Sequence, residues 1–453
     1  MKQTHPHASF LPAEMSRQWY LFLLPVGRLL LHRVWSQIPP VSPADVLPAA
    51  WIVARAILRF RHCRYLLCPH ALTVRQGILL RRTLYLPLRD AATAACEQTP
   101  LLRLCGGMRL RIGTAGLRRK TDASLYLSAR QAQARLPLRR RDASPAYRAK
   151  IWPVLLLAFS GSNAAVGLLA IAPALHRIGS LPGRAVEPAL TALLQASAWP
   201  FLLRQSGRLL MLGWLYSFCR SICRTANLKA WQEGTHLRIS GGLFTRRTIW
   251  INAHRITALE IRQTLLMRLF RLQTVVITAA GYGRDAGTRP VLIPAAGRRQ
   301  TAAALDRLLG NFPVCRSLLR PVLRECPRYL AAPLCLLAGG VPLTLRLPGR
   351  IGTTLCALLC VFCLWWLAVR FSGYRTAGFG LSRRAVSVRY CRGLALYEIH
   401  IPREVADAVI ITRTPRQRRL GLCGVEVRSF GEKRRRYRVP SLPYDAVRLL
   451  LSK

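Results

Sequence analysis

The chain carries the stretch HLRISGGLFTRRTIWI at residues 236–251, and 165 positions earlier it carries ALTVRQGILLRRTLYL at residues 71–86. At the same offset, residues 72–116 align with residues 237–281 without a gap, and thirteen of the 45 positions are identical. Chance pairing in a chain so rich in Leu, Arg and Ala would give roughly three to five matches, so the two stretches are copies of one module.

Both copies have the sequence pattern of a β-hairpin. Gln76-Gly77 separates two apolar runs in the first copy, and Gly241-Gly242 separates two in the second. The β-branched and aromatic residues of 83–86 and 248–251 favour strands over helices. We expect further strands in the second copy, and a closing helix with one apolar face in each copy. The expected strands are 256–262, 272–278 and 290–294, and the expected helices are 129–136 and 299–309.

A third and more divergent copy follows the second with an offset of 149. Its expected strands include residues 396–401, and residues 419–431 match the end of the module after a short insertion. A helix is expected at residues 444–451. This copy lacks the Arg-Arg-Thr triplet of the other two, so the three copies share a fold pattern more than a set of side chains.

Paired apolar segments precede the modules. A membrane span needs about 20 residues of low polarity, and each pair is interrupted by a turn-rich loop. We therefore expect transmembrane hairpins at residues 17–61, 151–222 and 329–371. Arg204 and Arg208 fall in the second hairpin and share one helix face. They form either a polar stripe turned toward partner helices or the region beyond a span that ends near Leu203.

Hairpins cross the membrane an even number of times, so all three modules lie on one face. The loop at residues 36–48 has no Lys or Arg, and residues 345–351 have only Arg346 and Arg350. The modules and their flanks are dense in Arg, and basic residues favour the cytoplasmic side. The modules are therefore expected in the cytoplasm.

The charge balance is strongly basic, with 69 Lys and Arg against 18 Asp and Glu and a formal net charge of +51. Guanidinium groups stay protonated and pair with phosphate, so this surface is expected to attract anionic lipid headgroups or nucleic acid. A genome biased toward Arg codons is an alternative origin of the excess.

Catalytic and metal-binding patterns have little support in the sequence. The 14 cysteines have no ligand spacing, and the pair Cys360 and Cys363 lies in an apolar run. His254 is matched by Arg89 and Arg403 in the other copies, so no acid and base pair is repeated. No Gly-rich phosphate loop precedes a Lys. We expect no catalytic residues, no metal, no cofactor and no enzymatic activity.

The order of these motifs resembles the bacterial pleckstrin-homology-like (PH-like) domains of multi-pass membrane proteins. The shared order is strand, Gly turn, Arg-Arg-Thr strand, Gln-Thr-x-Leu-x-Arg-Leu, short strand, Thr-Ala-Gly, Ile-Pro strand and helix, and the resemblance covers residues 17–451. It implies membrane α-helical hairpins plus three α+β domains at residues 62–140, 228–312 and 376–453. Each would be a bent antiparallel β-sandwich or barrel capped by a C-terminal helix, in a bacterial cell membrane.

Phosphate binding is the best chemical hypothesis for the basic residues. Strand alternation would turn one arginine of each Arg-Arg pair outward, where it can reach a headgroup. Solvated strand faces, and basic runs that only set topology, are the alternatives. The candidate headgroup contacts are Arg81, Arg82, Arg246, Arg247, Arg139, Arg140, Arg141, Lys433, Arg434 and Arg435.

The sequence thus predicts a non-enzymatic membrane protein whose cytoplasmic domains act as a scaffold or bind anionic lipid or a protein partner, a second copy of the chain included. The family resemblance adds a role in envelope stress or resistance to membrane-active peptides. A nucleic-acid-binding membrane protein and a transporter component are the alternatives. RNA-recognition aromatic platforms do not accompany the Arg runs, so nucleic acid is the weaker partner. The sequence names no ligand, partner or oligomeric state.

Overall fold

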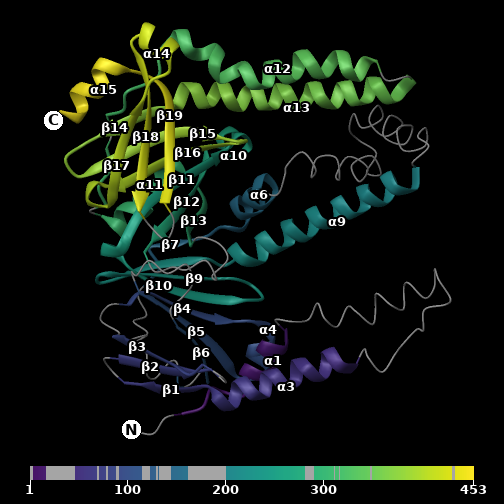
Figure 1. The fold of residues 1–453 in the computed structure, drawn as a ribbon, viewed down its shortest axis with the longest axis vertical. Helices are drawn as coiled ribbons and strands as arrows, with labels where there is room; N and C mark the ends of the chain where they lie inside the picture. The colour runs from purple at the N-terminus through teal and green to yellow at the C-terminus, as the bar shows by residue number, and fades with distance from the viewer. Residues whose placement is uncertain are drawn as a thin grey trace.

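The computed structural model describes residues 4–16, 46–68, 71–77, 80–87, 91–114, 123–128, 131, 144–161, 200–280, 290–310, 312–315, 317–346, 349–430 and 434–452. These residues form three β-rich domains stacked one above another, with the N-terminal domain at the bottom of Figure 1 and the C-terminal domain at the top. The long helices extend from the stack toward one side of that view.

Domain one consists of two three-strand layers. The first layer has the order β1-β2-β3 and the second β4-β5-β6, with the short helix α4 (Pro100–Leu104) between β4 and β5. Apolar residues that alternate along the strands, such as Leu72 and Val74 in β2, meet Leu110 and Ile112 of β5 in one core. The strands are β1 (Arg64–Leu67), β2 (Ala71–Gln76), β3 (Arg82–Pro87), β4 (Ala91–Gln98), β5 (Gly107–Thr114) and β6 (Ala123–Ser128).

Domain two repeats this order and is closed by the amphipathic helix α11 (Arg298–Leu309). Ala304 and Leu308, one turn apart on α11, are buried in the core beside Ile251 and Ile277. A one-turn helix η5 (Ala253–Arg255) links the two layers. The other elements are β8 (Lys229–Glu233), β9 (His236–Gly241), β10 (Arg246–Asn252), β11 (Ile256–Thr264), α10 (Leu265–Leu269), β12 (Leu272–Ala279) and β13 (Val291–Gly297).

Domain three has the same plan and ends in α15 (Tyr444–Leu451), which buries Val447. Its core joins Val388 and Ile399 of the first layer to Val425 and Val439 of the second. The other elements are β14 (Gly378–Leu381), β15 (Ala385–Arg392), β16 (Ala395–Pro402), η8 (Arg403–Val405), β17 (Ala406–Thr412), α14 (Pro415–Arg419), β18 (Leu422–Phe430) and β19 (Arg434–Pro443).

The strands expected in the second copy correspond to β11, β12 and β13, and the expected final helix corresponds to α15. The offset of 149 holds only for the first hairpin strand of the third copy. Ile239 pairs with Ile249, whereas Val388 pairs with Ile399, so the β15–β16 turn has one extra residue and the offset then becomes 150. His254 of η5 therefore corresponds to Glu404 of η8, and the expected match with Arg403 was wrong. The helix expected at residues 129–136 lies outside the described residues, apart from Gln131.

The helical segments are described in part. They are α1 (Phe10–Met15), α3 (Val46–His62), α6 (Ile151–Gly161), α9 (Pro200–Thr225), α12 (Cys326–Leu345) and α13 (Gly349–Thr376). Within the described residues, one helical stretch, Leu323–Leu345, is long and apolar enough to cross a membrane, and Ile151–Ser160 is a shorter apolar helix. Among the described helices, α12 packs against α13 (Figure 1), and α6 contacts α9, where the Phe159 ring lies edge-on to Trp214. Residues 17–45 and 162–199 lie outside the described residues, and the remaining spans stay predictions.

The long helices meet their domains at one end of the β-layers. The turn between β9 and β10 is tied to the end of α9, because Leu243 N donates to Cys223 O at 2.7 Å and Gly242 N to Ala226 O at 3.0 Å. In domain three, α13 approaches the β15–β16 turn so closely that a methyl group on Gly373 would lie 2.5 Å from Cys391 Cβ. We call this the helix-side end of the domains.

The sheets do not stop at domain boundaries. A seven-stranded sheet has the order β6-β5-β4-β10-β9-β8-β7, where β7 is Tyr147–Arg148, and a six-stranded sheet has the order β13-β12-β11-β16-β15-β14. The second layer of each of the first two domains therefore continues into the first layer of the next domain. Backbone hydrogen bonds, rather than linkers, set how these domains are stacked.

The repeated glycine of the hairpin turn predicts a stability effect. Gly242 has φ +104, and a Cβ atom there would lie 2.1 Å from Thr245 O, so Gly242→Ala is expected to destabilise the chain by about 1–3 kcal/mol. Gly339→Ala is the matched control, because Gly339 lies in α12 with no atom within 4 Å of the added methyl group. Thermal unfolding of the detergent-solubilised chain, followed by tryptophan fluorescence, measures the difference. Equal midpoints for the two variants would contradict the expectation.

Candidate functional site

Two antiparallel β-ladders join neighbouring domains, and the candidate sites lie along them. In the first ladder, β4 of domain one pairs with β10 of domain two, with Glu97 opposite Arg247. In the second, β11 of domain two pairs with β16 of domain three, with Arg262 opposite Tyr397. Side chains opposite each other in such a ladder are in contact range. Along each ladder, side chains of two domains are therefore close enough to interact.

The first junction contains a buried carboxylate between two arginines. Glu97 is 6% exposed, and its carboxylate lies 3.2 Å from Arg111 Nη2 within domain one and 3.4 Å from Arg247 Nε of domain two. Burial, together with the negative charge of Glu97, raises the pKa of Cys96 to about 12. Contacts with two guanidinium groups offset part of the cost of burying a carboxylate. Glu97 thus ties domain two to domain one.

The second junction uses the same chemistry on different strands. Glu260 of β11 is 7% exposed, and Arg435 of β19 approaches its carboxylate at 3.9 Å. Arg435 Nη1 also donates to Thr278 Oγ1 at 3.1 Å. Arg435 belongs to domain three, and both of its partners belong to domain two. An arginine–glutamate contact therefore crosses each of the two junctions.

Glu398 adds a second acid at this junction. Its carboxylate accepts a hydrogen bond of 2.5 Å from Arg389 Nη2 and lies 3.4 Å from His400 Nε2. Burial alone would raise the pKa of Glu398, but the hydrogen bonds from His400 and Arg389 and their charges outweigh burial and lower it to about 2. The other ring nitrogen of His400 lies 2.7 Å from Ser387 Oγ, so the imidazole is held on both sides.

The structure separates the predicted headgroup contacts into different groups. Arg246 is exposed and Arg247 faces Glu97, so strand alternation turns one arginine of that pair outward, as expected. Arg81 and Arg82 are both exposed. Arg435 is engaged with Glu260 and Thr278. The side chains of Arg139, Arg140, Arg141, Lys433 and Arg434 lie outside the described residues, so their roles stay predictions.

Apolar side chains gather at the helix-side end of each junction. The pairing of Gln98 with Arg246 brings α4 of domain one to the same end of the sheet as the β9–β10 turn. The pairing of Thr264 with Ala395 does the same for α10 and the β15–β16 turn. We name these places junction patch one and junction patch two. Patch one consists of Leu101, Leu104, Leu243, Phe244 and Arg246, and patch two of Leu269, Phe270, Leu394 and Arg392; all nine are exposed.

The sequence patterns did not lead us to predict these patches, although the repeated motif Gln-Thr-x-Leu-x-Arg-Leu contains some of their residues. The threonine is the helix N-cap, because Thr264 Oγ1 accepts from Met267 N at 3.3 Å and Thr99 Oγ1 from Leu102 N at 3.4 Å. Met267 and Leu102 are buried and anchor the helix. The final leucines of the motif, Leu104 at 85% and Leu269 at 75% exposure, therefore point outward.

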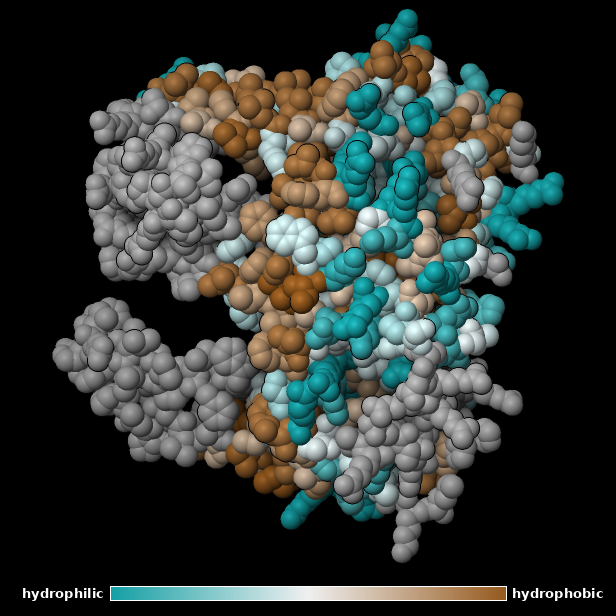
Figure 2. All heavy atoms as spheres, turned by 180° about the vertical axis from the view of Figure 1, so that it is seen from behind, coloured by the Kyte–Doolittle hydropathy of each residue, from teal (hydrophilic) through white to brown (hydrophobic). Residues whose placement is uncertain are grey.

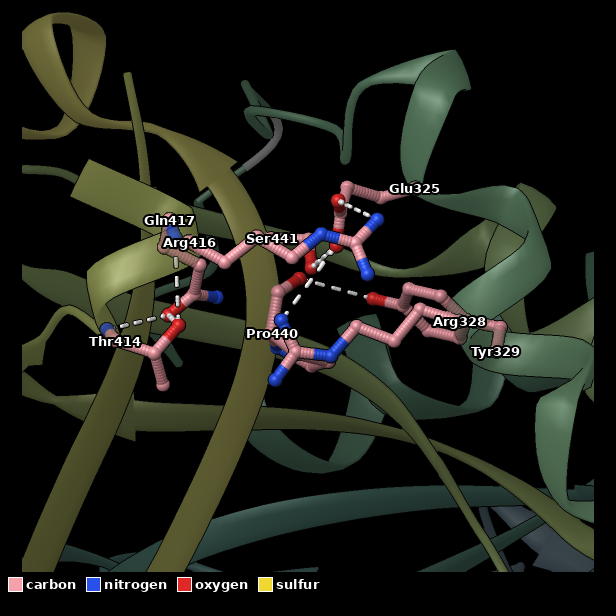
Figure 3. A network of polar contacts seen from close by, with 8 residues as sticks. All are labelled: Glu325, Arg328, Tyr329, Thr414, Arg416, Gln417, Pro440 and Ser441. Atoms are coloured by element: carbon pink, nitrogen blue, oxygen red, sulfur yellow. Dashed lines mark hydrogen bonds and ion pairs between the residues drawn. The ribbon is translucent and has the colours of Figure 1, made fainter. Parts of the chain in front are cut away.

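The start of α12 is fastened to domain three by a polar network (Figure 3). Glu325, 1% exposed, accepts from Ser441 Oγ at 2.8 Å and lies 3.5 Å from Arg328 Nη1. Arg416 of α14 reaches the same carboxylate at 3.7 Å, and Tyr329 OH donates to Pro440 O at 3.0 Å. Figure 3 shows the α12 residues converging on β19 and α14. The helix therefore cannot tilt without disturbing the domain.

Charge and hydrophobicity are segregated on the surface. Figure 2, which views the molecule from behind, shows hydrophilic residues along the stacked domains and hydrophobic residues over the α12–α13 helices at the upper left. Among the described residues, no group of three or more His, Cys, Asp or Glu is arranged to hold a metal ion. The arrangement can bind anions through guanidinium groups and can contact an apolar phase through the junction patches.

Comparisons with known proteins agree with the repeated architecture. A family model described as bacterial PH domain matches residues 22–148, 188–311 and 333–450. The chain is also 27% identical over 127 residues to the UPF0699 transmembrane protein YdbT of Bacillus subtilis (strain 168), a match that covers 27% of this chain and 25% of that protein. No solved structure matches the chain.

The first junction predicts a large effect of removing its buried acid. Glu97→Ala deletes one partner of a buried ion pair, which typically costs about 3–5 kcal/mol, and it is expected to speed amide hydrogen exchange in β4 and β10. Glu233→Ala is the control, because Glu233 pairs with Arg238 at 3.0 Å inside domain two and is partly exposed. A pair that water reaches in this way contributes less than a buried one, about 1 kcal/mol. Similar exchange rates in the two variants would contradict the role of Glu97.

The low pKa of Glu398 predicts a dependence of stability on pH. The folded pKa of about 2 lies below the ordinary value of 4.5, so this carboxylate contributes stability above about pH 4.5 that is lost as the pH falls toward about 2. Glu398→Gln is expected to flatten that part of the acid unfolding curve. Glu404→Gln, at an exposed position, provides the control. Unfolding midpoints between pH 5 and pH 2.5 measure the slope, and an unchanged slope in Glu398→Gln would refute the assignment.

Proposed function

Because the chain belongs to the bacterial PH domain family, we propose that it is a non-enzymatic, multi-pass membrane protein whose three domains form a scaffold on the cytoplasmic face of a bacterial membrane. The observation that carries this proposal is the pair of sheets shared between domains. Backbone ladders hold the domains more firmly than flexible linkers would, so the helix-side ends of all three are presented together.

Several observations support the membrane anchor. The helical stretch Leu323–Leu345 has the length and apolar composition of a span, and the relative in Bacillus subtilis is named a transmembrane protein. In Figure 1 the helices α3, α9, α12 and α13 leave the stack on the same side. The density of arginine in the domains, against its scarcity in the loop at residues 36–48, favours the cytoplasm for the domains.

The junction patches are the proposed contact with the anionic leaflet. Each combines exposed Leu or Phe side chains with an exposed arginine at the end where the helices join, as in Phe244 with Arg246 and Leu394 with Arg392. Apolar side chains at such a place insert among acyl chains, and the arginines reach lipid phosphates. Each basic residue near an anionic surface contributes about 1 kcal/mol, or about fivefold in affinity. Because the chain is already anchored, these contacts orient the stack rather than recruit it.

The proposal is tested on the full chain in lipid nanodiscs. Amide hydrogen exchange of residues 243–246 and 392–394 is expected to be slower in discs that contain phosphatidylglycerol than in discs of phosphatidylcholine alone. The double variant Arg246→Gln/Arg392→Gln is expected to lose most of this difference, since it removes the proposed arginine–phosphate contacts of both patches.

The matched control is Arg255→Gln/Arg403→Gln. It removes the same charge from the exposed one-turn helices η5 and η8, which follow the opposite ends of β10 and β16. This control is expected to keep the lipid-dependent protection. Equal exchange in both lipids for the unmodified chain would overturn the lipid contact, and equal losses in both double variants would reduce it to a net-charge effect.

A further inference from the structure

The two ladders between domains have the same register. Gln98 pairs with Arg246 in the first ladder, and the equivalent Gln263 pairs with Leu396 in the second. The equivalence continues along both ladders. Adding 165 to a residue number in β4 gives the equivalent residue of β11, and adding 150 to the number of its partner in β10 gives the equivalent partner in β16. The same strand-to-strand contact is therefore used twice within one chain.

One strand of each kind is left at an edge. β3 is the domain-one equivalent of β10 and β16, and among the described strands it pairs with β2 alone. β17 is the domain-three equivalent of β4 and β11, and in the same described set it pairs with β18 alone. The two edges lie in the bottom and top domains of the stack (Figure 1). The two edges are complementary, because strands equivalent to β17 pair with strands equivalent to β3 at both internal junctions.

The burial of these strands agrees with open edges. Most residues of β4 and β11 are buried in the first part of each strand, whereas along β17 none of the seven is buried. Tyr85 of β3 is 66% exposed, but the equivalent Trp250 of β10 is half-buried against the neighbouring domain. Side chains of the equivalent strands are less exposed at the internal junctions, so a strand added beside β3 or β17 is expected to cover the corresponding side chains there.

We propose that β17 of one copy pairs antiparallel with β3 of a second copy, so that the chain assembles head to tail through the contact that already joins its domains. The internal register places Ile410 opposite Leu84, Val409 opposite Tyr85 and Thr412 opposite Arg82. A contact between two different surfaces repeats from copy to copy, giving an open row or a closed ring.

The sequence of the two edges suits this pairing. β17, Ala-Asp-Ala-Val-Ile-Ile-Thr, has no Pro or Lys, the residues that commonly protect an exposed edge from pairing. Pro87 of β3 is equivalent to Asn252, which lies beyond the last β4–β10 pair, so it does not interrupt the ladder. Arg413 would fall opposite Arg81, but its guanidinium lies 4.0 Å from the centre of the Tyr444 ring and hydrogen-bonds to Leu422 O, away from the edge.

The test uses disulfide crosslinking between two differently tagged full-length copies in one membrane. One copy carries Arg82→Cys and the other Thr412→Cys, the positions equivalent to Arg247 and Glu97, whose side chains meet at the internal junction. Mild oxidation is expected to give a dimer that contains both tags. The register control replaces Thr412→Cys by Ile411→Cys, which puts the thiol on the opposite face of the strand and is expected to abolish the product.

A blocking variant guards against accidental proximity. Tyr65 of β1 exchanges backbone hydrogen bonds with Thr4, on the side of β1 that faces away from β2. Hydrogen-bonding direction alternates along a strand, so Val74, the β2 partner of Tyr65, bonds to Leu84 of β3. The N–H of the next residue, Tyr85, therefore faces the open edge. Tyr85→Pro removes this outward donor and none of the backbone donors that β3 directs to β2, so the domain should fold while the crosslink is lost. The proposal is overturned if Arg82→Cys and Thr412→Cys give no more dimer than the unmodified chain with its native cysteines, or if the register control or the Tyr85→Pro chain crosslinks equally. Crosslinking to a different protein instead of a second copy would also overturn it.

Discussion

The backbone pairing of β4 with β10 and of β11 with β16 is the constraint on which the rest of the structure depends. A sheet edge exposes a row of N–H and C=O groups, and leaving them without partners in a buried junction would be costly. Each inner edge is satisfied by the next domain, so the domains are stacked by hydrogen bonds that depend on geometry. The helices, turns and charged side chains then take positions set by that stack.

The scarce acidic side chains are used where this constraint is strongest. With 18 carboxylates against 69 basic residues, most arginines have no acid to pair with, yet Glu97, Glu260 and Glu398 all lie at the two junctions. Glu97 and Glu260 contact arginines of the neighbouring domain, whereas Glu398 pairs with Arg389 inside domain three. Many of the remaining described guanidinium groups are exposed, and guanidinium groups in general pair well with phosphate.

The helix-side end shows how one local rule produces a shared surface. The capping threonines, Thr99 and Thr264, begin equivalent short helices, and burial of Leu102 and Met267 fixes which leucines point away. The ladder then brings each short helix beside a turn of the following domain. A patch built this way belongs to a junction and not to an isolated domain, which joins the proposed membrane contact to the stacking of the domains.

The sequence by itself determined the repeat, the strands and the hairpin turns, because these depend on local patterns: alternation in residues 248–251, the glycine at Gly242 and the periodicity of α11. It also determined that Arg246 and Arg247 face opposite ways. Only the tertiary structure decided that Arg247 and Arg435 would be engaged with glutamates of a neighbouring domain, and that β3 and β17 would lie at the edges of the described sheets. Pairing between distant strands is made by main-chain groups common to nearly all residues, so no local pattern specifies which edges meet.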